Sequence, residues 1–348
     1  MKRISAAIAL AVALAGATAA IATSAPAPSG RVVFMRYRLQ NNPLWSELFI
    51  ADAAGSHERK LTHAPNGFQD DHPSWSPRGT TIVFQRCPSR GNGSCAIFAT
   101  GIGGGGARRL SSHCRPGGGL PSCVDEHAPA YSPDGGRIAF IRFDGVPLAG
   151  GVKDGLIMIA RPDLRRAKVL VPFATLRSDP DDLAWAPDGK HLAFTVVNDD
   201  GAAKPANGRA LYTVGADGRG VRRITPWSLR AAGRPSWSPD GRTILFATQP
   251  AGTDESLGYG ANLYTVHPNG TGLRQLTHNS GYARIFAGAY SPHDGSWIVF
   301  STTEDAAGAD RGLPDLFVMR SDGSGIRHLT RSVAWDSAPA WGPLGGIR

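Results

Sequence analysis

The chain has 348 residues, of which 41% are hydrophobic and 19% are charged, and its formal net charge is +9. This length and composition provide for a single domain with an ample core. Beyond residue 21 no segment is apolar enough to span a membrane, and no recognition helix or stacking stripe indicates nucleic acid. The mature chain is therefore expected neither to cross a membrane nor to have a nucleic-acid partner.

The N-terminus has the pattern of a secretory signal peptide. Lys2 and Arg3 precede an Ala-rich apolar stretch, and the small residues Ala17 and Ala19 predict cleavage after Ala19. The apolar stretch continues to Ile21, so an uncleaved anchor is the alternative. We expect residues 1–19 to direct export to the periplasm or the extracellular space, and residues 20–30 to form a flexible lead-in.

Two interleaved motifs then recur along residues 31–348. The first, as in "RPSWSPDGRTILFATQ" (234–249), reads as a strand, a tight Ser-Pro-Asp-Gly turn and a second strand. The second, as in "DLFVMRSDGSGIRHLT" (315–330), reads as an alternating strand, a turn and a short strand. One period therefore holds four strands, A to D. The first motif places an aromatic residue at Trp75, Tyr131, Trp185, Trp237, Tyr290 and Trp341.

Four short strands in about 50 residues are typical of one propeller blade. A single blade cannot bury both of its faces, so blades must stack around an axis. The six periods predict an all-β, six-bladed propeller of four-stranded blades. The C-terminus supplies only strand A, around Ala340 and Trp341, and "RVVFMRY" (31–37) supplies strand B without a preceding A. We expect the two ends of the chain to share one blade.

Both motifs resemble the WD-like repeats of TolB-type β-propellers. The resemblance rests on the repeated Pro-x-Trp-Ser-Pro-Asp-Gly, followed by the Asp-Gly-x-Gly turn and Leu-Thr, and it covers residues 31–348. TolB itself carries an α/β domain before its propeller, whereas this sequence enters strand B almost directly after its leader. Some propellers related to TolB are metal-dependent oligogalacturonate lyases, which supplies an enzymatic alternative to a binding function.

Four cysteines fit an exported protein. Cys87 ends strand B of its blade and Cys95 begins strand C, whereas Cys114 and Cys123 bracket a loop. Local disulfides Cys87–Cys95 and Cys114–Cys123 are the economical pairing. A zinc site is the alternative, although the spacings are longer than the short pairs that zinc usually takes.

Basic residues gather in the turns between strands C and D. A solvated, solubilising surface accounts for them, and a basic rim that meets anionic envelope polymers is the alternative. These residues are Arg108, Arg109, Arg165, Arg166, Arg222, Arg223, Arg274 and Arg327.

The two faces of the predicted propeller differ. A–B and C–D turns are short and regular, whereas the B–C and D–A loops on the other face are irregular, so we expect binding there. Strand A is innermost, so the residues three to five positions before each blade aromatic converge at the axial mouth of the irregular face. They are Asp70, Asp71, His72, Glu126, His127, Asp181, Asp182, Arg234 and Asp336.

Carboxylates gathered at one mouth repel one another unless a cation, an arginine or water compensates. Ca²⁺, Mg²⁺ or Mn²⁺ suits such a donor set, with Asp71, His127 and Asp182 as candidate ligands. The alternative is that these side chains cap the D–A loops. The sequence contains neither a G-x-S-x-G nor an H-E-x-x-H motif, and no catalytic constellation stands out.

These patterns favour an exported, non-enzymatic and monomeric propeller that binds an envelope protein or glycan through its irregular face. The alternative is a metal-dependent carbohydrate-active enzyme of the oligogalacturonate lyase kind. In such an enzyme a metal acidifies the proton beside a uronate carboxyl and a base removes it.

Overall fold

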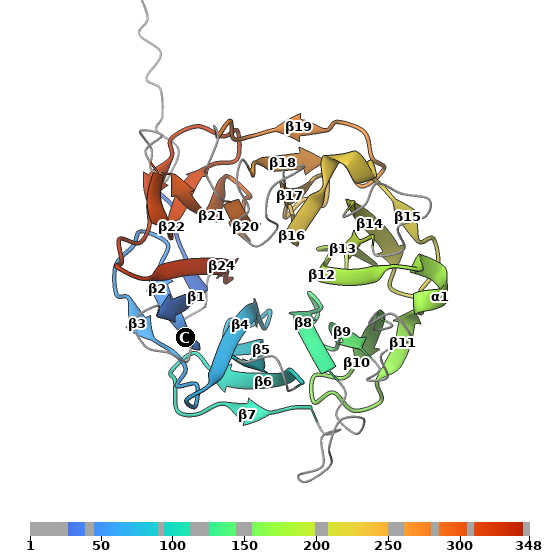
Figure 1. Cartoon of the computed structure of the whole chain (residues 1–348), viewed down its shortest axis with the longest axis horizontal. Helices are drawn as coiled ribbons and strands as arrows, with labels where there is room; N and C mark the ends of the chain where they lie inside the picture. The colour runs from blue at the N-terminus through green and yellow to red at the C-terminus, as the bar shows by residue number, and fades with distance from the viewer. Residues whose placement is uncertain are drawn as a thin grey trace, which may run out of the picture.

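The computed structural model describes residues 27–38, 45–89, 94–111, 125–143, 155–198, 208–249, 261–279, 285–304 and 310–343. Over these residues the chain is nearly all β, with one short helix, α1 (Phe173–Leu176), and a 3-10 turn at Trp227–Leu229. Small sheets surround a central axis, so the chain forms a β-propeller (Figure 1). Neither helical segment of the described chain has the length and hydropathy of a membrane span.

The strands fall into sets of four, which we name after the strand nearest the axis. The first two sets are β4 (Phe68–Trp75), β5 (Thr81–Pro88), β6 (Ala96–Gly101) and β7 (Arg108–Arg109), then β8 (Asp125–Tyr131), β9 (Ile138–Phe143), β10 (Gly155–Ala160) and β11 (Lys168–Val171). The β12 set has β12 (Asp179–Trp185), β13 (His191–Val197), β14 (Arg209–Gly215) and β15 (Arg222–Arg223). The β16 set has β16 (Ala231–Trp237), β17 (Ile244–Thr248), β18 (Leu263–Val266) and β19 (Arg274–Gln275). The β20 set has β20 (Ile285–Tyr290), β21 (Trp297–Glu304), β22 (Asp310–Arg320) and β23 (Arg327–His328).

The β24 set combines the two ends of the described chain. It consists of β24 (Trp335–Trp341), β1 (Arg31–Arg38), β2 (Trp45–Asp52) and β3 (Arg59–Lys60). β24 pairs antiparallel with β1, with Val32 opposite Trp341. A single parallel pairing of Ser46 with Gln69 links this set to the β4 set. Residues just before β1 are held as well, because Trp341 Nε1 donates to the Ser29 carbonyl at 2.9 Å.

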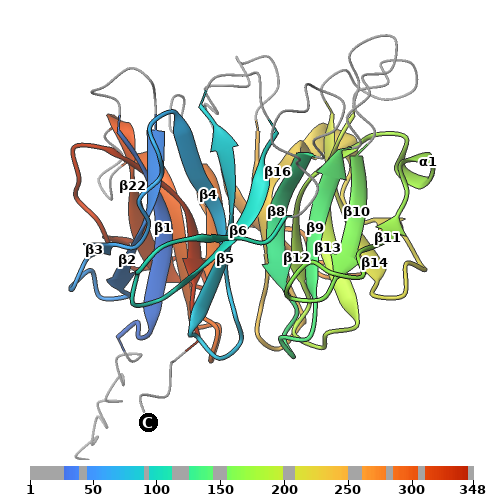
Figure 2. The same ribbon diagram turned by 90° about the horizontal axis from the view of Figure 1, so that it is seen from below.

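The hydrophobic core lies between neighbouring sets, whose strands run along the axis (Figure 2). Phe84 of β5 packs with Val33 and Leu48 of the β24 set, whereas the adjacent Val83 packs with Phe140 of the β8 set. Both faces of β5 are therefore buried, which requires a neighbouring sheet on each side. A fully buried phenylalanine occupies the second strand of every set, at Phe34, Phe84, Phe140, Phe194, Phe246 and Phe300.

Each innermost strand contains an irregularity in its pairing with the second strand of its set. In β4 the register shifts between Asp71 and Ser74, and His72 adopts a left-handed backbone with φ of 50°. Ala128 in β8 and Ala338 in β24 adopt the same conformation, with φ of 47° and 48°. Because a bulge redirects the side chains beside it, these irregularities decide which residues face the axis.

In four of the six repeats the aromatic residue bonds to the innermost strand of the preceding set. Where it is tryptophan, the indole can donate to that strand's backbone, as Trp185 Nε1 does to the Ala130 carbonyl at 3.1 Å. Where it is tyrosine, the backbone N–H donates to a serine hydroxyl, as Tyr131 does to Ser74 Oγ at 3.1 Å. The Trp341 indole donates to Ser29 instead, and Trp237 Nε1 has no hydrogen-bond partner among the described residues. In all six copies a tyrosine follows a serine of the preceding repeat and a tryptophan follows an alanine.

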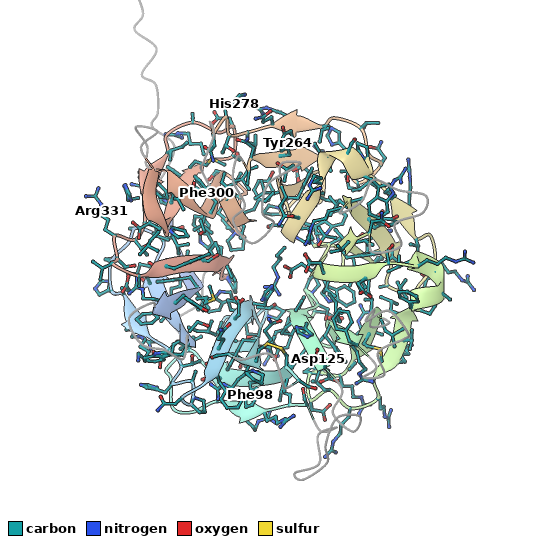
Figure 3. All side chains as sticks on the ribbon, viewed as in Figure 1. Phe98, Asp125, Tyr264, His278, Phe300 and Arg331 are labelled. Atoms are coloured by element: carbon teal, nitrogen blue, oxygen red, sulfur yellow. A yellow bond between two sulfur atoms is a disulfide. The ribbon has the colours of Figure 1, made fainter. Side chains whose placement is uncertain are left out.

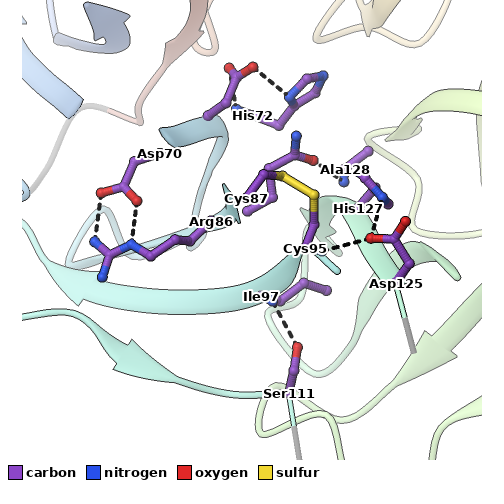
Figure 4. The surroundings of a disulfide bond; sticks show 12 residues. Asp70, His72, Arg86, Cys87, Cys95, Ile97, Ser111, Asp125, His127 and Ala128 are labelled. Atoms are coloured by element: carbon purple, nitrogen blue, oxygen red, sulfur yellow. Dashed lines mark hydrogen bonds and ion pairs between the residues drawn. A yellow bond between two sulfur atoms is a disulfide. The ribbon is translucent and has the colours of Figure 1, made fainter. Parts of the chain in front are cut away.

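The predicted Cys87–Cys95 disulfide is present in the β4 set, where it joins the end of β5 to the residue just before β6 (Figure 4). Cys114 and Cys123 lie outside the described residues, so their pairing stays a prediction.

The aromatic contacts predict an energetic coupling between neighbouring sets. Trp185→Tyr alone removes the indole donor and part of the buried surface, and we expect it to lower the free energy of unfolding by about 2 kcal/mol. Adding Ala130→Ser restores the serine–tyrosine arrangement seen at Ser74 and Tyr131, and we expect it to recover about 1 kcal/mol. Urea unfolding of the two single variants and the double variant measures the coupling. If the changes in the free energy of unfolding caused by the two substitutions were additive, the Ser–Tyr and Ala–Trp correlation between repeats would not reflect an interaction energy.

Candidate functional site

A cavity of about 350 Å³ lies on the axis, where the innermost strands begin (Figure 3 shows the side chains around this axis). It is bounded by residues beside the bulges of β4, β12, β16 and β24 and by residues at the ends of other strands. Its charged lining residues are Asp71, His72, Asp181, Asp182, Arg209 and Arg234. Three acidic and three basic side chains therefore meet at this mouth.

His72 lies between two carboxylates that come from different sets. Its Nδ1 lies 3.1 Å from Asp71 Oδ2, and its Nε2 lies 3.2 Å from Asp182 Oδ2. Burial lowers the pKa of His72, but the charges and hydrogen bonds of Asp182 and Asp71 outweigh burial and hold this pKa well above its usual range. Burial likewise raises the pKa of Asp71, but His72 and then Arg234 bring it below the usual range. At neutral pH His72 is therefore a cation between two anions.

Arg234 reaches across the axis from β16. Its Nη1 donates to the Pro73 carbonyl of β4 at 2.5 Å, and its Nη2 donates to the Pro129 carbonyl of β8 at 2.9 Å. Its Nε lies 3.8 Å from Asp182 Oδ1. Burial lowers the pKa of Arg234, although Asp182 and Asp71 oppose the shift. A guanidinium remains charged in this setting. Arg234 is therefore a cation that links the β16 set to the β4 and β8 sets.

Arg234 also separates two cavities. It lines the charged cavity and a second one, of about 410 Å³, on the side of the A–B turns. The second cavity is bounded by the repeated aromatic and proline residues, such as Trp185 and Pro187. The axis is therefore charged at one end and mostly apolar at the other.

Asp181 and Arg209 form an ion pair at the edge of the charged cavity, with Nη1 2.7 Å from Oδ2. The protein around Asp181 desolvates its carboxylate and raises its pKa, although the side chain reaches solvent; Asp182 adds to the rise and Arg209 opposes it. The Asp181 side chain is 42% exposed, so it is the most accessible acid that we find among the charged lining residues.

Several polar atoms that line the charged cavity have no hydrogen-bond partner among the described residues. They are His72 Nδ1, Asp182 Oδ1, Arg209 Nε, Arg234 Nε and Gln249 Oε1, of which Asp182 Oδ1 and Arg234 Nε face each other in the ion pair described above. Asp182 is only 5% exposed. Buried polar atoms are rarely left unpaired, so Gln249 Oε1, which belongs to no ion pair, is available to a ligand or to ordered water.

Three of the predicted carboxylates lie in ion pairs within their own sets rather than along the cavity. Each stands five residues before the blade aromatic and directly opposite an arginine in the second strand. The pairs join Asp70 to Arg86 at 2.5 Å, Glu126 to Arg142 at 2.7 Å and Asp336 to Arg36 at 2.6 Å. These carboxylates already have partners, and a ligand would have to displace an arginine to reach them.

His127, which was predicted to face the axial mouth, does not line the charged cavity. Its Nε2 lies 2.8 Å from Asp125 Oδ1, and its ring meets Phe143 edge-on. Among the described residues, His127 belongs to a group of donors close enough to hold a metal ion, but the other members are Cys87 and Cys95 rather than axial carboxylates.

Sequence reasoning did not find Arg209, Gln249 or Trp335, which line the cavity from the ends of other strands. No sequence signal that we can identify marks them. The three acid–arginine pairs within the sets could have been found in the sequence. In these sets an acidic residue stands five residues before the aromatic, and an arginine stands two residues after the buried phenylalanine, as Arg86 does after Phe84.

Comparisons with known proteins agree with this architecture. No family model matches the chain. Over 107 residues the chain is 38% identical to the Tol-Pal system protein TolB of Anaeromyxobacter dehalogenans, a match that covers 31% of this chain and 21% of that protein. The chain thus spans about a fifth of the length of this relative.

Two solved structures share the fold. The crystal structure of TolB from Acinetobacter baumannii superposes with a TM-score of 0.64 at 21% identity, covering 91% of this chain and 68% of that one. The putative TolB from Agrobacterium tumefaciens superposes with a TM-score of 0.56 at 17% identity, covering 91% of each chain. The chain is a TolB-like β-propeller, related in sequence to TolB over part of its length.

Proposed function

We propose that this chain is an exported, non-enzymatic β-propeller that binds a protein or glycan of the cell envelope at the axial mouth and its surrounding loops. The observation that carries the proposal is Gln249 Oε1, an uncharged acceptor at the charged cavity that has no hydrogen-bond partner among the described residues. Export rests on the leader pattern of residues 1–19. The envelope setting is supported by the name of a relative, a Tol-Pal system protein.

The charge balance of the mouth favours binding over catalysis. A general base needs a free lone pair near the reacting proton. His72 is instead held as a cation by Asp71 and Asp182. The three basic side chains also neutralise the three acidic ones, which removes the need for a metal ion to offset carboxylate repulsion.

A capture experiment tests the proposed binding site. We expect Gln249→Leu to weaken cross-linking of the chain to its envelope partner about tenfold, because one unpaired cavity acceptor is removed. Quantitative mass spectrometry after cross-linking in native envelope measures this loss. Gln275→Leu, in the outer strand β19, is the matched control and should leave capture unchanged.

Equal capture by both glutamine variants would contradict the proposed site. The enzymatic alternative makes a different prediction for the same cavity. It requires saturable heat on titration of the metal-stripped protein with Mn²⁺ or Ca²⁺, together with turnover of polyuronides. Both signals would have to disappear in an Asp71→Asn/Asp182→Asn double variant.

The charged state of His72 predicts a specific dependence of stability on pH. The pKa of His72 is raised above 6.5, so its contribution is complete below about pH 6.5 and is lost as the pH rises through the folded-state value. The pKa of Asp71 is lowered below 3.8, so its contribution is present above that pH and is lost under more acidic conditions. We expect His72→Asn to destabilise the protein by about 2 kcal/mol or more between these limits. Asparagine is chosen because it tolerates the left-handed backbone of His72.

Urea unfolding across the pH range measures this effect. The difference between wild type and His72→Asn should shrink at alkaline pH, whereas the control His267→Asn, at an exposed histidine whose ring contacts the Arg242 carbonyl, should leave the wild-type profile unchanged. A constant difference at all pH values would mean that His72 is not held as a cation.

We further propose that the strand sets form six blades and that β24 closes the ring against β1. Support comes from the antiparallel pairing of these two strands and from buried clusters on both sides of the β24 set. Trp75 of the β4 set also donates to the Ala340 carbonyl of β24 at 2.9 Å. Gly342 lies so close to Trp75 that a Cβ there would stand 2.5 Å from the indole.

We also propose residues 31–348 as the propeller domain and a monomer as the working form.

Deleting residues 338–346 tests the closure. The deletion removes half of β24 and exposes the edge of β1, so we expect cooperative thermal unfolding to be lost. A truncation after Pro343, which leaves β24 intact, is the control. Calorimetric melting of the deletion variant at the temperature of the full chain would refute the shared blade.

A further inference from the structure

The disulfide of the β4 set lies beside a histidine from the neighbouring β8 set (Figure 4). The sulfur atoms of Cys87 and Cys95 and a ring nitrogen of His127 all lie within 4.8 Å of one another. Cys95 is 7% exposed, whereas the His127 side chain is 25% exposed. The group is thus held in the protein but remains reachable from solvent.

The histidine is oriented by its surroundings. Asp125 Oδ1 accepts a hydrogen bond from the Cys95 backbone N–H at 2.7 Å and lies 2.8 Å from His127 Nε2. The ring of Phe143 meets the imidazole edge-on, with 5.4 Å between the ring centroids. Asp125 therefore fixes both the start of β6 and the imidazole. Because Asp125 occupies Nε2, Nδ1 is the ring nitrogen left for a metal, and a carboxylate on the other nitrogen is the usual support for a metal-binding imidazole.

The backbone next to the histidine is also constrained. Ala128 adopts the left-handed conformation, and its N–H donates to Gln85 Oε1 of β5 at 2.9 Å. Gln85 lies two residues before Cys87 on the same strand. The bulge of β8 is thus tied to the strand that carries one of the sulfurs, which keeps the histidine beside the disulfide.

We propose that Cys87, Cys95 and His127 form a zinc site when the disulfide is reduced, with Asp125 supporting the imidazole or completing the tetrahedron. Two thiolates and an imidazole are a donor set that zinc prefers, at about 2.3 Å for sulfur and about 2.0 Å for nitrogen. The sulfurs are bonded to each other in the structure and must separate to about 3.8 Å around such an ion. The site therefore exists only in the thiol state.

The redox step balances with a dithiol as reductant. The dithiol supplies two electrons and two protons and becomes a disulfide, while the Cys87–Cys95 bond breaks and two thiols form. Zinc binding then releases the two thiol protons to solvent. The change replaces a covalent link within the β4 set by a metal link between the β4 and β8 sets. This inference is independent of the proposed partner binding at the axial mouth.

Cobalt titration tests the site. The chain carries Cys114→Ser and Cys123→Ser so that the only remaining thiols are those of the proposed site. After reduction with a phosphine, which does not retain the metal, Co²⁺ is added without oxygen. We expect saturable binding of one ion, with the sulfur-to-cobalt charge-transfer bands and the d–d spectrum of a tetrahedral site, and loss of both on adding Zn²⁺. The oxidised protein should show neither band.

Variants assign the ligands. Cys87→Ser/Cys95→Ser should abolish the charge-transfer band, and His127→Ala should weaken Co²⁺ binding at least about tenfold. His191→Ala, at an exposed histidine far along the sequence, is the matched control and should bind as the parent does. Near-ultraviolet circular dichroism checks that each reduced protein is folded. Absence of the bands in the reduced parent, unfolding of that parent, or full affinity in His127→Ala would each overturn the proposal.

Discussion

The inner edge of each innermost strand has no partner strand, and the structure depends on how the backbone groups along that edge are satisfied. An open strand edge exposes unpaired N–H and carbonyl groups, and burying them unpaired is costly. Here side chains from other sets provide the missing partners. Trp185 donates to the Ala130 carbonyl, the Tyr131 N–H donates to Ser74, and Arg234 donates to the Pro73 carbonyl across the axis. Inter-set contacts therefore serve the backbone as well as the core.

The arrangement of charges on the axis follows from the same edge. The bulges interrupt pairing with the second strand and expose short stretches such as Asp71 and His72 to the centre. Charges that meet in a confined space must balance, because desolvation penalises an unpaired ion. Arg209 and Arg234 supply positive charge from two other sets, and His72 supplies the rest by holding its proton. The mouth is thus polar and nearly neutral.

Much of this fold could be predicted from the sequence because the repeats encode it locally. The turn residues and the alternating strands of the repeats appear as turns and strands in the structure. The first and last strands, which lack a partner within their own repeats, pair with each other near Val32 and Trp341. The Cys87–Cys95 link could also be predicted, since it spans one hairpin.

The candidate site was harder to predict, because each innermost strand has a bulge shortly before its aromatic residue. The bulge changes the directions of the side chains beside it. Asp70 turns to Arg86 within its sheet, whereas Asp71 faces the axis, and strand periodicity alone could not separate them. Of the cavity residues, Arg209 begins β14 and Gln249 directly follows β17, and the repeats carry no polar signature at these positions. Their role follows only from where the strand ends meet in space.

The alternation of Ser–Tyr and Ala–Trp contacts has a consequence for how such a protein can evolve. A repeat carries an aromatic residue that must suit the repeat before it and a small residue that must suit the repeat after it. Ser74 suits Tyr131, whereas Ala130 suits Trp185. A gene duplication or exchange that places a tyrosine repeat after an alanine repeat would remove the indole donor to the alanine carbonyl without supplying a serine acceptor for the tyrosine N–H. The repeats share one fold, but their order cannot be changed freely. A rearranged order preserves these contacts only where each aromatic residue still follows a repeat with the matching serine or alanine.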